Sequence, residues 1–192
     1  MLPVNVFYKQ KMQHTLQSTA RPYVPDWMKS LGRCKYPKGE IMSSWPFGTT
    51  ADIGLRVFSS SPEGVLKEAV LGMQNILLSA AEFDLPWHHS QWNIGKDDWD
   101  RMLVKVLEET LYRAEIHNEW VVDISFMLGK QLHCQVAWVD ASEVEREVEI
   151  KAITRHDLQV RELGAAEQIS SPYPEVPDII GPGWIADVVF DI

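Results

Sequence analysis

The stretch TTADIGLRV (residues 49–57) predicts a β-strand with one buried face. From Ile53 onward, every second residue is apolar and its neighbours are polar or small, which is typical of a strand that covers a core on one side. A carboxylate, Asp52, stands at the start of this strand. The stretch WIADVVFDI (residues 184–192) alternates in the same way and carries Asp191. If the two strands pair, their acids can meet.

Between these stretches the spacing of apolar residues changes to that of two amphipathic helices. Ser61, followed by Pro62, is a typical helix start, and apolar residues continue at helical spacing to position 77. Asp97 or Asp98 can cap a second helix, whose apolar stripe over 99–111 is the clearest such signal in the chain. The segment FDLPWHHSQWNIG (83–95) breaks the pattern and is expected to be loop, with room for a short strand.

After the second helix the period becomes two. Residues 120–127 and 132–138 alternate on either side of a Gly-Lys turn and predict a hairpin, and a further strand is expected from 148 onward. A long Pro/Gly-rich loop, SSPYPEVPDIIGPG (170–183), precedes the last strand. The order of elements predicts an α+β fold, with a two-layer arrangement of a sheet and two main helices packed on one of its faces.

Composition divides the chain of 192 residues into two parts. Residues 1–41 carry seven Lys/Arg and two Asp/Glu, and their apolar residues show no regular spacing. Residues 42–192 carry eleven Lys/Arg and twenty-five Asp/Glu. We interpret 1–41 as an N-terminal extension, either a disordered basic arm or a segment upstream of a translation start at Met42, and 42–192 as the folded domain. Two cysteines and no apolar run of membrane-spanning length favour a cytoplasmic protein. The acidic domain is expected to avoid nucleic acid and to suit a basic protein partner.

Familiar catalytic motifs are absent from the sequence, so no catalytic or organic-cofactor-binding residue is assigned. The candidate site is a set of hard oxygen ligands. Asp52, Asp191 and the main-chain carboxylate of Ile192 would come together if the first and last strands lie side by side. Oxygens without a soft ligand indicate Ca²⁺ or Mg²⁺ rather than zinc. The alternative for each acid alone is a solvated surface carboxylate.

Four stretches, in this order, resemble the archease family: TADIGLRV, DDWDRMLVKVLEETLYRAE, EIKAITRHDLQV and the final VVFDI. The resemblance implies the archease fold and a protein that is not itself an enzyme. It implies an activator of the GTP-dependent RNA ligase RtcB in tRNA splicing or RNA repair, which promotes guanylylation of the ligase and its multiple turnover. It also implies a divalent cation held by Asp52, Asp191 and Ile192, with Ca²⁺ as the first candidate.

Three departures from the family pattern qualify this resemblance. The family's His before Thr-Ala-Asp is Thr49 here, residues 139–147 lack the usual Gly-Glu and His, and the loop over 164–183 is long. His156 is interpreted as a supporting or surface residue and not as a ligand. Two alternatives stay open: a metal-dependent phosphoesterase that uses Asp52 and Asp191, and an archease-like interaction module with another partner.

Overall fold

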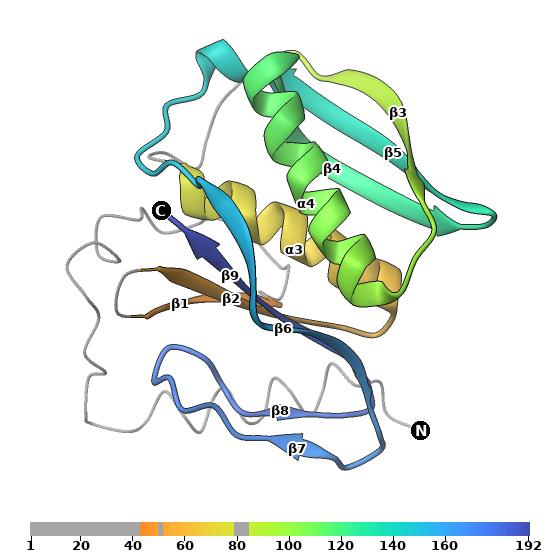
Figure 1. Ribbon diagram of the computed structural model, residues 1–192, viewed down its shortest axis with the longest axis vertical. Helices are drawn as coiled ribbons and strands as arrows, with labels where there is room; N and C mark the ends of the chain where they lie inside the picture. Colours follow the sequence, from red (N-terminus) through yellow and green to blue (C-terminus); the bar gives the residue numbers. More distant parts are fainter. Residues whose placement is uncertain (1–42, 50–51, 79–84) are drawn as a thin grey trace.

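The two stretches with acids lie next to each other in a four-stranded antiparallel sheet with the order β1-β2-β9-β6 (Figure 1). The structure is a computed structural model that describes residues 43–49, 52–78 and 85–192. The predicted extension over 1–41 lies outside the described residues. The strands of this sheet are β1 (Ser44–Gly48), β2 (Ile53–Ser59), β9 (Gly183–Asp191) and β6 (Ala152–Leu163).

Two helices cover one face of this sheet, as the sequence predicts. Helix α3 (Pro62–Leu77) begins after Ser61, whose hydroxyl accepts from the Gly64 N–H, and helix α4 (Trp99–Ile116) begins after Asp98, whose carboxylate accepts from the Arg101 N–H at 2.9 Å. These side chains satisfy backbone donors that a helix start leaves unpaired. The apolar stripes of both helices are buried in the main core together with the inward faces of β2 and β9.

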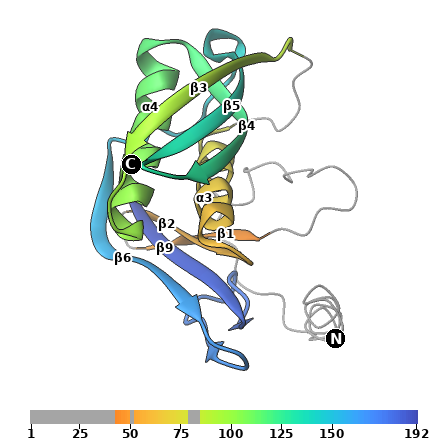
Figure 2. The same cartoon turned by 90° about the vertical axis from the view of Figure 1, so that its right-hand side faces the viewer.

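A second sheet, with the order β3-β5-β4, packs on the other side of the helices (Figures 1 and 2). Its strands β3 (His88–Gly95), β4 (Glu119–Leu128) and β5 (Gln131–Asp140) include the predicted hairpin. The α+β class is therefore confirmed, with the strands divided between two sheets rather than joined in one. The segment expected as a loop with room for a short strand forms a full strand, because β3 pairs with β5 along eight residues and buries Trp92 and Ile94. Residues 83 and 84 of that segment lie outside the described residues.

The face of the four-stranded sheet that points away from the helices carries its own small core. The segment 164–182 folds across it and contains a two-stranded ribbon, β7 (Gln168–Ile169) and β8 (Ile179–Ile180), below the sheet in Figure 1. We call this segment the cover segment. It packs apolar side chains against residues of β1, β6 and β9, and the buried members of this second core are Trp45, Phe47, Leu163, Val176, Ile179 and Ile185. The predicted long loop thus contains secondary structure.

In the described part of the chain, no helix combines the length and the apolar character needed to cross a membrane.

Candidate functional site

Strand pairing brings the two predicted acids to the same end of the β2–β9 pair. Strands β2 and β9 are antiparallel, and their pairing begins with Ile53 opposite Phe190. Asp52 directly precedes Ile53 and Asp191 directly follows Phe190 in the chain. Asp52 is half-buried and Asp191 exposed, so both can meet a ligand from solvent.

Thr49 fixes the backbone at Asp52. The Asp52 N–H donates to the Thr49 hydroxyl at 3.1 Å, and the hydroxyl and N–H of Thr49 both donate to the Asp52 carbonyl, at 3.0 and 3.1 Å. The residue that replaces the family's His therefore holds the start of β2. On the same strand, Gly54 lies under the ring of Phe47, where an added Cβ would come within 2.1 Å of ring carbon. Phe47 can pack here only because position 54 has no side chain.

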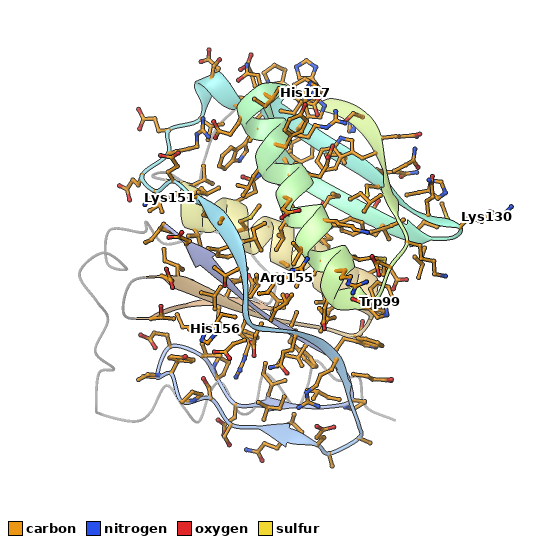
Figure 3. The ribbon with its side chains drawn as sticks, in the orientation of Figure 1. Trp99, His117, Lys130, Lys151, Arg155 and His156 are labelled. Atoms are coloured by element: carbon orange, nitrogen blue, oxygen red, sulfur yellow. The ribbon has the colours of Figure 1, made fainter. Side chains whose placement is uncertain are left out.

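A lysine that the sequence did not single out lies at the end of β9. The Lys151 ammonium donates to the main-chain oxygen of Ile192 at 2.8 Å, and the Lys151 N–H donates to the Asp191 carbonyl at 2.8 Å (Figures 1 and 3). A positive charge thus accompanies the third predicted ligand. Lys151 lies in the KAIT stretch that resembles the family, and the spacing of residues in this stretch does not indicate the contact.

Asp52 also borders a cavity of about 710 Å³ on the outer face of the four-stranded sheet. Its volume falls within the roughly 300–1,000 Å³ typical of ligand pockets. Thr49 and Asp52, the middle of β6 and the cover segment surround it, and β2 and β9 supply its floor. Its lining residues are Phe47, Thr49, Asp52, Arg56, His156, Asp157, Leu158, Gln159, Pro172, Tyr173, Asp187 and Val189.

A buried ion pair forms part of the cavity floor. Arg56 and Asp187 are opposed on β2 and β9, and the guanidinium Nε and Nη2 donate to the two carboxylate oxygens at 2.7 Å each. The Gln159 amide adds a third bond to Asp187 at 2.7 Å. The hydrogen bond to Asp187 raises the pKa of Arg56, against the opposing effect of burial. Such a two-bond geometry compensates for the loss of hydration of both charges.

A bulge in β6 forms one wall of the cavity. The pairs Thr154–Val189 and Gln159–Asp187 are separated by four residues on β6 and by one on β9. Within the bulge, Asp157 has a φ of 53°, which non-glycine residues seldom adopt. In Figure 3, Arg155 and His156 lie on opposite sides of β6. Bulges of this kind redirect side chains and often border functional sites.

The interpretation of His156 as a supporting or surface residue agrees with its position, because its side chain is 81% exposed and its ring Nε2 lies 3.3 Å from the Asp157 carboxylate. His133 is exposed and lies 2.5 Å from Asn93, and His88 stacks on Trp138. Burial in the core, where Cys134 is 1% exposed, raises the pKa of its thiol to about 12. Among the described residues, no three His, Cys, Asp or Glu side chains form a cluster able to hold a metal ion. The predicted ligand set contains only two such side chains, Asp52 and Asp191, because its third member is the main-chain carboxylate of Ile192.

Comparison with known proteins identifies relatives over most of the domain. The model of the Archease protein family (MTH1598/TM1083) matches residues 46–192. Two curated relatives are each called "Protein archease". The one from Pyrococcus furiosus is 24% identical over 143 residues, which cover 70% of this chain and 100% of the relative. The one from Thermococcus gammatolerans is 23% identical over 134 residues, 66% of this chain and 94% of the relative.

Solved structures also resemble the chain. The solution structure of protein 1598 from Methanobacterium thermoautotrophicum has a TM-score of 0.50 at 18% identity and covers 79% of this chain and 100% of its own. The crystal structure of a Thermotoga maritima protein described as "an archease, possible chaperone" has a TM-score of 0.49 at 21% identity. The match covers 77% of this chain and 95% of the Thermotoga chain. At this identity, the first of these similarities supports the fold alone.

Proposed function

Because the chain belongs to the archease family, we propose that it is an accessory protein that binds a divalent cation and activates a GTP-dependent RNA ligase of the RtcB type. It would act by direct protein contact in tRNA splicing or RNA repair, promoting guanylylation of the ligase and its repeated turnover. It would not itself be an enzyme. The observation that supports the proposal is the pairing of β2 with β9, in which Ile53 and Phe190, the chain neighbours of Asp52 and Asp191, are opposed.

The donor set fits a hard cation. Asp52, Asp191 and the carboxyl group of Ile192 would supply oxygens, which Ca²⁺ and Mg²⁺ prefer, and Ca²⁺ accepts the less regular geometry that strand ends provide. The three hydrogen bonds between Thr49 and Asp52, two of which involve the Thr49 hydroxyl, fix the backbone at one proposed ligand, and the Lys151 ammonium donates to the main-chain oxygen of Ile192. When bound, the cation would supply positive charge that offsets the repulsion between the carboxylates and can attract oxygen ligands of the partner.

Calcium titration of the purified full chain by calorimetry tests the cation site. Asp52→Asn and Asp191→Asn should each weaken binding and leave the unfolding midpoint near that of the parent, because neither side chain lies in the apolar core. One Gly appended after Ile192 should weaken binding in the same way, while Glu143→Gln, an exposed acid on another element, should not. Equal Ca²⁺ affinity in the parent and the Gly-extended chain would remove Ile192 from the site.

Activation is tested with an RtcB-type ligase from the same source, in multiple-turnover RNA joining with GTP. The parent chain should raise the rate and the yield of guanylylated ligase, and Asp52→Asn should abolish both effects. The opposite result, no activation and no complex with the ligase, would leave an archease-like module with another partner. The alternative of a metal-dependent phosphoesterase would be favoured if the chain alone released phosphate from phosphoester substrates and Asp52→Asn lost this activity.

A further inference from the structure

The cavity beside Asp52 has features that a cation site does not explain. Its floor contains a buried guanidinium with an unused donor. Arg56 is only 7% exposed, and its Nε and Nη2 are taken up by Asp187. Its remaining nitrogen, Nη1, is buried and has no hydrogen-bond partner among the described residues. A buried donor of this kind requires an acceptor, and Arg56 is among the residues that line the cavity.

The charge around the cavity excludes an anion as the source of that oxygen. Arg56 and Asp187 neutralise each other as a pair. Asp52 and the exposed Asp157 also line the cavity, so the remaining formal charge is negative as long as no cation is bound at Asp52. A phosphate or carboxylate would be repelled, whereas a neutral carbonyl oxygen accompanied by a cationic group would be attracted.

The walls between floor and mouth are apolar and aromatic. Tyr173 from the cover segment stacks on Phe47 with ring centroids 4.2 Å apart, and Leu158 and Pro172 line the cavity as well. The aliphatic part of a Lys or Arg side chain packs on such surfaces while its charged end stays near carboxylates or the face of an aromatic ring. The acidic, apolar and aromatic parts of the lining therefore all suit a ligand with a Lys or Arg side chain.

We propose that this cavity receives a basic segment of a partner protein, with a main-chain carbonyl oxygen accepting from Arg56 Nη1 and a Lys or Arg side chain beside Asp52 and Asp157. Residues 42–192 carry eleven Lys/Arg against twenty-five Asp/Glu, so the domain as a whole favours a basic partner. The proposal deepens the proposed function, on which it rests for the identity of the partner, and adds a docking site distinct from Asp191, which does not line the cavity.

The test is a titration of the isotope-labelled full chain with the blocked peptide acetyl-Gly-Arg-Gly-amide, followed by NMR. The matched peptide carries citrulline, which keeps the shape of arginine and removes its charge. Shifts should be saturable and confined to the cavity, should include the side-chain N–H signals of Arg56, and should be weaker with citrulline. Because no ligase is present, the outcome is independent of whether the chain activates one.

Asp157→Asn is the critical variant, because asparagine tolerates a positive φ and the site is exposed. It should weaken binding of the arginine peptide by up to about fivefold, the effect of one exposed charge pair, whereas Glu143→Gln should have no effect. No saturable binding at about 10 mM peptide, equal affinity for citrulline, or an unchanged affinity in Asp157→Asn would overturn the proposal. The proposal would also be overturned if charge reversal within residues 1–41 shifted the cavity signals in the absence of peptide. Such shifts would assign the cavity to the chain's own basic segment.

Discussion

Arg56→Met should destabilise the domain by about 3 kcal/mol. The substitution keeps an unbranched side chain of similar length and removes both 2.7 Å bonds to Asp187. Asp187 is 5% exposed and would retain only the Gln159 amide as a donor. Breaking a buried pair by removing one partner costs about 3–5 kcal/mol. The lower end applies, because Gln159 remains and because the unpartnered Nη1 of Arg56 is removed at the same time.

The assay is equilibrium unfolding in urea, followed by tryptophan fluorescence. A loss of about 3 kcal/mol is smaller than the typical stability of a domain, about 5–15 kcal/mol, so the variant should still fold. The double variant Arg56→Met/Asp187→Leu should come within about 1 kcal/mol of the parent, because no buried charge is left without a partner. The exposed pair Lys67–Asp123 is the control, with side chains 39% and 49% exposed, and Lys67→Met should cost at most about 1 kcal/mol.

Two results would refute this reasoning. A loss below about 1 kcal/mol in Arg56→Met would mean that the pair behaves like a surface ion pair, in contrast to its burial. A double variant as unstable as the single one would mean that the guanidinium contributes through packing and not through the carboxylate of Asp187.

Three further predictions concern other elements. The hydrogen bonds from Arg161 and the Gly164 N–H lower the pKa of Glu167. The contribution of Glu167 to the free energy of unfolding is therefore present above the ordinary glutamate pKa of about 4.3 and is lost as the pH falls below it. The urea midpoints of the parent and Glu167→Gln should differ at pH 7 and converge near pH 3, and a difference that stays constant with pH would argue against the ion pair. Burial raises the pKa of Cys134 to about 12, so in a Cys34→Ser background a thiol reagent at pH 8 should react only after unfolding. Asp98→Ala should cost about 1 kcal/mol in urea unfolding through loss of the α4 cap, and an unchanged midpoint would contradict that role.

Local signals predicted the parts of the fold that depend on neighbouring residues. The caps at Ser61 and Asp98 and the alternation along β2 and β9 each arise within a few positions, and all are present in the structure. The strand β3 was missed because it is an edge strand with an exposed outer face and two adjacent histidines, His88 and His89, which weaken the alternation. Only Trp92 and Ile94 carry its inward pattern. The division into two sheets depends on pairing over long sequence distances, which periodicity does not encode.

The cavity could not be predicted for a related reason. Its floor depends on Arg56 and Asp187 being opposed across two strands that are 131 positions apart in the chain. In the sequence, Arg56 reads as the polar side of an alternating strand and would be placed in solvent. It is buried because the cover segment packs over the same face, and a stretch rich in Pro and Gly gives no hint of the second core around Val176 and Ile179.

Two of the three departures from the family pattern, Thr49 and the long segment over 164–183, lie around this cavity and leave the strand pairing intact. Thr49 and the long segment over 164–183 both contribute to its surroundings, whereas the pairing of β2 with β9 rests on main-chain bonds that side-chain changes hardly affect. The two proposed activities are therefore separable by substitution. Asp191→Asn should impair Ca²⁺ binding and spare the arginine peptide, and Asp157→Asn should do the reverse. Asp52→Asn should impair both, since Asp52 alone belongs to the proposed cation set and to the cavity lining. If Asp191→Asn and Asp157→Asn instead weakened both ligands equally, the cavity and the cation site would be one site.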